Sequence, residues 1–299
     1  MILCCGEALI DMLPRETAQG DPAFAPLAGG AVFNTAIALG RLGAPVGWFG
    51  GLSTDLFGDV LARAMTASNV DYTHADRSDR PTTLAFVTLT DGQARYAFYD
   101  ENTAGRMLTE DDLPELGEEI TTLFLGGISL AAEPGADTYA ALAERAGDRI
   151  VMVDPNIRPG FIRDEATFRA RLDRILARAD IVKLSDEDMD WLGTTPQDLI
   201  ARGTTVVLVT RGAEGVDIVT PKSDGHADAH PVTVVDTVGA GDTFNGGFLA
   251  GLSREGILTR GALRMAKMEV LETAAALGTR AAAVTVSRAG ANPPWESEL

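Results

Sequence analysis

Asp242 ends the string Asp236-Thr-Val-Gly-Ala-Gly-Asp242, whose residue types suit the transfer of a phosphoryl group. Two glycines let successive backbone N–H groups point into one concavity, and a helix that begins there adds positive potential. A phosphate or a developing anion fits such a concavity. A carboxylate beside it has a chemical use if it accepts the proton of a hydroxyl nucleophile as the phosphoryl group arrives. By itself, Asp242 could also be a plain helix cap.

The elements on either side would position this string. An apolar, β-branched run at 232–235 precedes it and indicates a strand. Apolar residues at 244, 248, 249 and 252 follow at helical spacing. We therefore expect a strand, a glycine turn and a helix. The Asp242 carboxylate would lie at the helix mouth, and the backbone N–H groups of residues 239–242 would form an anion hole.

Strand-like and helix-like segments alternate along most of the chain. This alternation predicts βαβ units, a mostly parallel sheet and helices on both of its faces. The expected strands are 46–50, 122–125, 150–153, 181–184 and 206–210, and the expected helices are 136–146, 165–178 and 259–277. Cys4 and Cys5 lie in an apolar first strand, where neighbouring side chains point to opposite faces, so we expect buried, reduced thiols.

One region interrupts the alternation. Residues 83–90 and 94–100 read as two strands joined by Asp91-Gly92, which is a hairpin signal. Together with the polar stretch 12–27, which contains proline, they indicate a small β appendage inserted into the α/β core. Such an appendage could be a lid, because phosphoryl transfer gains from excluding water. An ordinary surface hairpin fits the pattern equally well.

Composition and charge exclude several classes of function. The chain has 299 residues, 45% of them hydrophobic, which suffices for one large domain. It has neither 18 consecutive apolar residues nor a charged signal-peptide start, and we expect a soluble cytoplasmic protein. A net charge of −18 argues against nucleic acid or anionic membrane as a partner. Three scattered histidines give no metal-ligand spacing, and neither a Walker A string nor a Rossmann glycine fingerprint is present.

Three further segments carry groups suited to a hydroxyl-bearing substrate. Gly29 and Gly30 lead into a helix whose first turn holds Asn34, an amide that can donate and accept. The alternative use of such small residues is tight packing of helix on sheet. Asp11 follows the first strand, and its position at a strand end suits either a ligand or a turn. Arg158 ends the turn Asp154-Pro-Asn-Ile-Arg158 with a fixed, planar cation.

The string at 236–242 and the segment Gly29-Gly30-Ala-Val-Phe-Asn34-Thr-Ala36, followed by Arg41-Leu-Gly43, resemble the two signatures of the ribokinase-like (PfkB-type) carbohydrate kinases. The resemblance runs from Gly6 to beyond residue 280. It implies a ribokinase-like three-layer α/β sandwich with a mostly parallel central sheet and a small inserted β-sheet lid. A single kinase domain would span 1–299, with lid segments at about 12–27 and 82–101. In many relatives the lid pairs two subunits, which implies a homodimer.

The same resemblance implies roles for individual residues. Asp242 would be the catalytic base, with Gly239, Ala240 and Gly241 as the anion hole. The sugar would contact Asp11, Gly29, Gly30, Asn34 and Arg158. ATP would contact Lys183, Ser185, Thr210, Gly212, Gly215, Gly239 and Gly241. Asp188 would help to organise hydrated Mg²⁺, and many relatives are also activated by K⁺.

Three positions need comment against the family pattern. Relatives often carry Asn and Glu where Ser185 and Asp188 stand, and the bland interpretation of this pair is a helix capping box. Many relatives place an Asn beside the adenine where this chain has Glu272. Arg211 could neutralise phosphate charge, although many relatives have an uncharged residue there.

The resemblance implies an ATP-dependent kinase that phosphorylates a primary hydroxyl of a small sugar. The segments Cys5–Met12, Ala85–Leu89 and Tyr96–Tyr99 are most similar to those of members that phosphorylate fructose, which is therefore the expected acceptor. 2-Keto-3-deoxygluconate is the alternative, with Arg158 clamping its carboxylate. A different class also remains open, namely a sugar- or nucleotide-binding sensor without catalysis.

Overall fold

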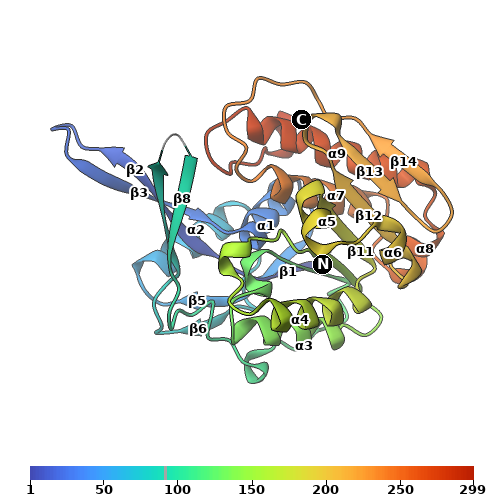
Figure 1. Cartoon of the computed structure of the whole chain (residues 1–299), viewed down its shortest axis with the longest axis horizontal. Coiled ribbons are helices and arrows are strands. Elements are labelled where there is room, and N and C mark those ends of the chain that lie inside the picture. The colour runs from blue at the N-terminus through green and yellow to red at the C-terminus, as the bar shows by residue number, and fades with distance from the viewer. Residues whose placement is uncertain (91–92) are drawn as a thin grey trace.

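A computed structural model describes residues 1–90 and 93–299, with the backbone alone at 88–90 and 93–96. Its central sheet has eight strands in the order β14-β13-β12-β11-β10-β9-β1-β4 (Figure 1). The six strands from β4 to β12 in this order are parallel to one another. Strand β13 pairs antiparallel with β12, and β14 pairs antiparallel with β13. The bounds are β1 Ile2–Cys5, β4 Val46–Phe49, β9 Thr122–Gly126, β10 Ile150–Asp154, β11 Ile181–Ser185, β12 Val206–Thr210, β13 Val216–Val219 and β14 Asp224–Ala227.

Helices cover both faces of this sheet and form two separate hydrophobic cores. Strand β1 contributes to both, because Ile2 and Cys4 belong to one core and Leu3 and Cys5 to the other. The buried, unpaired cysteines are thus confirmed. On the first face lie α1 (Ala31–Arg41), α2 (Leu56–Ala67), α7 (Ala240–Arg254), α8 (Arg260–Met265) and α9 (Met268–Val286). On the second lie α3 (Gly135–Glu144), α4 (Glu165–Arg178), α5 (Asp186–Leu192) and α6 (Pro196–Ala201).

A four-stranded sheet projects from this sandwich, as its blue and cyan strands show in Figure 1. Its order is β3 (Pro22–Gly29), β2 (Leu9–Glu16), β7 (Leu84–Thr90) and β8 (Gln93–Tyr99). The expected small β appendage is therefore present, and β7 pairs with β8 in antiparallel register. The expected turn residues Asp91 and Gly92 lie outside the described residues. Strands β5 (Gly51–Ser53) and β6 (Asp76–Ser78) form a separate two-stranded sheet.

The predicted strand at 232–235 is wrong. This run has no regular secondary structure, and Val234 and Val235 are largely exposed. The backbone N–H groups of Val235 and Asp236 both donate to the Val286 carbonyl at the end of α9, at 2.8 and 3.2 Å. A β-branched run needs a neighbouring strand to form a ladder, and here a helix end takes that place.

The predicted helix at 259–277 is in fact two helices. Helix α8 ends at Met265 and α9 begins at Met268, because Ala266 and Lys267 have extended ψ angles of 137° and 155°. No Gly or Pro marks this break, so tertiary packing overrides helix propensity there. Leu263 of α8 and Leu271 of α9 both enter the same core. Within the described ranges, no helix is both long and apolar enough to cross a membrane.

Candidate active site

The first turn of α7 forms an open anion hole. Gly239 precedes the helix with a φ of 77°, and no side chain caps the helix start. The Ala240 N–H donates to the Thr237 carbonyl at 3.3 Å. Among the described residues, the N–H groups of Gly239, Gly241 and Asp242 have no acceptor. Backbone donors at a helix N-terminus bind anions well, so this turn can hold a phosphoryl group.

The Asp242 carboxylate lies in this turn and is almost fully buried. Its Oδ2 accepts a hydrogen bond from Asn34 Nδ2 at 2.9 Å. Burial raises the pKa of Asp242 to about 7, an effect that the Asn34 hydrogen bond and Lys183 oppose and that Asp154 and Glu7 reinforce. A carboxylate with this pKa is partly ionised at neutral pH and can accept a proton more readily than an ordinary aspartate.

Lys183 lies beneath the same turn. It is buried in β11, and its Nζ is 3.2 Å from Asp154 Oδ2, which also accepts from Asn245 Nδ2 at 2.7 Å. A Cβ added to Gly241 would lie 3.3 Å from the Lys183 Nζ. The ammonium group thus adds a fixed positive charge directly under the anion hole. Lys183 contacts this turn rather than lining the larger cavity described below.

A small cavity of about 180 Å³ opens on one side of this centre. Asp11 and Gly30 line it together with Arg158. Asp11 was expected at the end of the first strand, but that strand ends at Cys5 and Asp11 lies within β2 of the projecting sheet. Burial raises the pKa of Asp11 to about 6, and its carboxylate has no hydrogen-bond partner among the described residues. It is therefore available to accept from substrate hydroxyl groups.

The glycines of this segment are required by their neighbours. A Cβ at Gly29 would collide with the Asp11 carboxylate. Gly30 has a φ of 110°, and its Cβ would lie 3.0 Å from the Glu7 carbonyl oxygen. Asn34 follows in the first turns of α1 and points at Asp242. The two expected signatures therefore meet in space although 208 positions separate Asn34 and Asp242.

Several residues of this cavity were not predicted from the sequence, and four of them carry polar groups or aromatic rings. Phe98 of β8 and Phe161 make an edge-to-face ring pair at 4.2 Å, and Asn156 adopts a positive φ of 43°. Glu7 is buried, and its two oxygens accept from the Ala31 N–H and from the Ser129 N–H and hydroxyl. The Asp154-Pro-Asn turn was the only signal for Asn156. Glu7 and Phe98 lie within the segments Cys5–Met12 and Tyr96–Tyr99 but were not singled out there, and nothing in the sequence marks Phe161.

A larger cavity of about 580 Å³ opens at the start of α7, where Ala240 and Gly241 line it. Four of the predicted nucleotide contacts line it, namely Thr210, Gly212, Gly215 and Gly241. Its remaining wall is largely apolar and includes Val232, Val234, Ala283 and Val286. An apolar slot that ends at free backbone N–H groups suits a planar base with attached phosphates. Val232 and Val234, from the run misread as a strand, thus belong to this wall.

Ser185 and Asp188 form a capping box at the start of α5, which confirms the structural interpretation of this pair. The Ser185 Oγ accepts from the Asp188 N–H at 3.1 Å, and Asp188 Oδ2 accepts from the Ser185 N–H at 3.0 Å. The Ile157 N–H donates to Asp188 Oδ1 at 2.8 Å. Both carboxylate oxygens are thus engaged. Within the described residues, no group of three or more His, Cys, Asp or Glu side chains could hold a metal ion.

Two other departures are explained by placement. Glu272 does not line the larger cavity, and it lies against β14, where a Cβ at Gly225 would approach its carboxylate to 2.6 Å. The α9 residues that do line the cavity begin at Thr279, two helical turns later. The expectation that position 272 adjoins the adenine is not supported by this geometry. Arg211, which could have neutralised phosphate charge, is instead paired with Asp186 and Asp217 at 2.7 and 2.6 Å.

Comparisons with known proteins agree with this geometry. The chain is 53% identical to a fructokinase of Rhizobium leguminosarum bv. trifolii over 267 residues, which is 87% of this chain and 82% of that protein. The structure of a Xylella fastidiosa fructokinase with bound ATP is 30% identical and has a TM-score of 0.89, with 97% of this chain and 93% of that chain covered.

A fructokinase double mutant of Vibrio cholerae O395, in its fructose, ADP and potassium ion bound form, is 25% identical and has a TM-score of 0.83. The match covers 97% of this chain and 93% of that one. The sequence model described as pfkB family carbohydrate kinase matches residues 1–298. The chain therefore belongs to the pfkB family of carbohydrate kinases.

Proposed function

We propose that the protein is an ATP-dependent fructokinase that phosphorylates a primary hydroxyl of D-fructose. One observation carries this proposal. The larger, mostly apolar cavity reaches Gly241 at the start of α7, and Asn34, which holds the buried Asp242 carboxylate, lies on α1 one turn after Gly30 and Ala31 of the small cavity. This arrangement supports transfer from a nucleotide to a small polyol. The fructokinase names of the relatives support fructose as the acceptor.

In the proposed reaction, Asp242 accepts the proton of the acceptor hydroxyl. The hydroxyl oxygen then forms a bond to the γ-phosphorus of ATP, the bond to the bridging oxygen breaks, and ADP leaves. The N–H groups of Gly241 and Asp242 stabilise the charge on the transferring group, and Lys183 adds positive potential from below. Asn34 orients the base through its 2.9 Å hydrogen bond. Gly239 and Ala240 shape the anion hole.

The sugar would occupy the small cavity. Its hydroxyl groups would donate to Asp11, whose carboxylate has no other partner among the described residues. Gly29 and Gly30 would present backbone groups to it, Gly30 from the cavity wall itself and Gly29 from the adjoining end of β3. Arg158 would add a positive charge to the wall of this cavity. We treat residues 1–299 as a single domain whose segments at about 12–27 and 82–101 form a lid over this sugar.

ATP would occupy the larger cavity along Thr210, Gly212 and Gly215, with its phosphates directed at Gly239 and Gly241. The free N–H groups and the absence of any Cβ at these glycines fit a phosphate chain. Mg²⁺ fits as an ion carried by the nucleotide, because the carboxylate of Asp188 is fully engaged near Ser185. Bound Mg²⁺ would neutralise phosphate charge.

Other parts of the proposal extend beyond the site. The Vibrio cholerae structure names a potassium ion, and we propose that K⁺ activates this protein as well. We also propose a homodimer formed through the lid, since Phe24, Leu27 and Tyr99 are exposed large apolar residues on its strands. A cytoplasmic location is supported by the need for ATP and by two reduced cysteines.

The test is an assay of ADP formation with Mg-ATP, with K⁺ or Na⁺, against fructose, 2-keto-3-deoxygluconate and ribose. We expect turnover with fructose, and only a small effect of Arg158→Gln on kcat. Turnover with the keto acid alone, abolished by Arg158→Gln, would favour the alternative in which Arg158 clamps a carboxylate. Binding of ATP without turnover on any acceptor would favour the non-catalytic sensor and contradict the proposal.

A further inference from the structure

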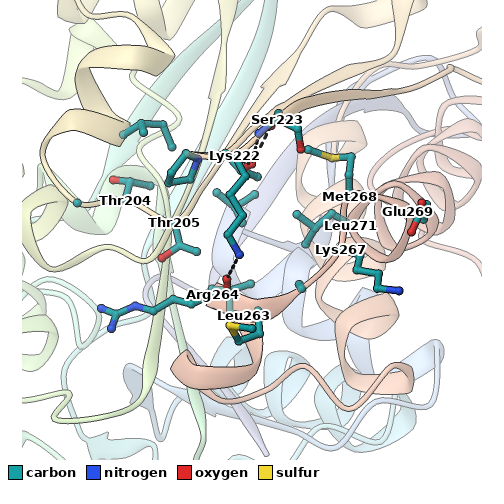
Figure 2. Close-up of a pocket in the computed structure, with 17 residues that line it drawn as sticks. Thr204, Thr205, Lys222, Ser223, Leu263, Arg264, Lys267, Met268, Glu269 and Leu271 are labelled. Carbon is teal, nitrogen blue, oxygen red and sulfur yellow. Dashed lines mark hydrogen bonds between the residues drawn. The ribbon is translucent and has the colours of Figure 1, made fainter.

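A second large cavity lies at the opposite end of strand β12 from the proposed nucleotide cavity. It has a volume of about 680 Å³ and is bounded by the start of β12, the turn between β13 and β14 and the break between α8 and α9 (Figure 2). Val206, the first residue of β12, lines it, whereas Thr210 at the other end of that strand lines the proposed nucleotide cavity. The two cavities are therefore separate.

Lysine is concentrated at this second cavity. The whole chain contains only three lysines, and two of them, Lys222 and Lys267, line it, while Lys183 serves the active site. Arg264 adds a third cation. None of these three cations forms an ion pair with a carboxylate in the described part of the chain. In a protein with a net charge of −18, these three cations create a local preference for an anion near the cavity. In the view of Figure 2 the Lys222 ammonium lies between the Arg264 guanidinium and the Lys267 ammonium, which extend to opposite sides.

The cavity also has apolar walls. Val206, Leu263 and Leu271 contribute to these walls. The Lys222 ammonium donates to the Arg264 carbonyl at 3.0 Å, as the dashed line in Figure 2 shows. That contact uses one of the three N–H donors of the Lys222 ammonium group. Glu269 is the one acidic residue among those that line the cavity. The combination suits a compact ligand with an apolar ring face and a strongly anionic group.

We propose that this cavity is an effector site for a small phosphomonoester, with Lys222 and Lys267 as the partners of its phosphate. A nucleoside monophosphate and a sugar monophosphate share this chemistry. Helix α9 gives the site a route to the catalytic centre, because its first residues line this cavity and its last turns, from Thr279 to Val286, line the nucleotide cavity. Occupancy of one cavity would thus change the affinity of the other, reciprocally.

The small number of lysines makes a direct test practical. Reductive ¹³C-methylation keeps the positive charge and labels three lysines and the terminal amine, so few NMR signals arise. Lys222→Gln and Lys267→Gln assign the two signals from the cavity. The probes are inorganic phosphate, AMP and fructose 6-phosphate. Calorimetry on unmodified protein supplies dissociation constants, and Arg280→Gln, an exposed position on α9 that lines neither cavity, is the matched control.

We expect at least one probe to shift the Lys222 and Lys267 signals, and the double Gln variant to weaken its binding by roughly ten- to a hundredfold. The same probe should change the KM for ATP, while Arg280→Gln behaves as wild type. AMP alone would identify a nucleotide site, and fructose 6-phosphate alone a sugar phosphate site. No shift up to about 5 mM probe would overturn the proposal. So would binding that the double variant retains, or binding that leaves the KM for ATP unchanged.

Discussion

Asp242→Asn should abolish turnover and at the same time stabilise the fold. Asparagine keeps the shape of the side chain and an oxygen that can accept from Asn34 Nδ2. It removes the proton acceptor, so kcat should fall by about 10²- to 10⁴-fold. It also removes a charge that the folded protein must keep buried. A substitution that damaged the fold would lower activity and stability together, so opposite signs distinguish the two explanations.

The size of the stabilisation follows from the pKa of Asp242, which burial raises from 3.8 to about 7. In the unfolded chain the carboxyl group ionises near pH 4, whereas the folded protein retains the proton up to about pH 7. The wild type therefore loses stability as pH rises between these values, by about 4 kcal/mol in total as an upper bound. Asp242→Asn lacks this loss. Its advantage in unfolding free energy should grow by about 2 to 3 kcal/mol from pH 5 to pH 8.

Urea unfolding of both proteins at pH 5 and pH 8 measures this growth, and Asp148→Asn, at an exposed surface position, controls for loss of charge alone. Wild-type kcat/KM for fructose should also fall about tenfold per pH unit below about pH 7, because only the ionised carboxylate accepts a proton. Retention of near wild-type turnover by Asp242→Asn would refute the catalytic role. If the two proteins differed in unfolding free energy by the same amount at pH 5 and pH 8, the raised pKa of the buried Asp242 would be refuted.

Two further substitutions test the surroundings of Asp242. Gly239→Ala places a side chain at a φ of 77° and a Cβ about 2.6 Å from that of Ala291, so both kcat and stability should fall, the latter by about 1 to 3 kcal/mol; urea unfolding and steady-state kinetics check this, and wild-type values would contradict it. Asn34→Ala removes the donor that favours the ionised form of Asp242, so the pH midpoint of kcat/KM should rise by about one unit. An unchanged midpoint would show that this hydrogen bond does not tune the base.

The regular elements were predictable where one physical signal dominated. Short apolar runs such as 150–153, in an alternating strand and helix pattern, are typical of strands buried on both faces, and β10 is fully buried. The helix expected at 165–178 begins and ends at those residues, because Asp164 caps it and its apolar residues keep helical spacing. The run at 232–235 has equally strong β propensity but no strand beside it. Propensity alone cannot reveal which neighbours a segment will meet.

The sequence motifs predicted which residues belong to the site, but not which of these residues touch one another. Asn34 was expected to bind the sugar, and the structure adds that it holds Asp242, a pairing that depends on how α1 and α7 meet. Phe98 and Phe161 come from unrelated parts of the chain, and neither has a sequence signal for a ring pair. The misplaced Glu272 shows a different limit of motif reasoning. A residue two turns further along α9 has the same helical spacing, yet Thr279 lines the nucleotide cavity and Glu272 does not.

The charges beneath α7 explain how the site can receive phosphate without rearrangement. A lysine buried near a helix N-terminus meets positive potential from the helix, so Lys183 would be costly there without compensation. Asp154 supplies that compensation at 3.2 Å, and the Asn245 amide holds the same carboxylate oxygen. The N–H groups of Gly239, Gly241 and Asp242 have no acceptor of their own in the described part of the chain. Positive potential therefore remains directed at the phosphate position before ATP arrives, and it is strongest at the turn that carries the proposed base.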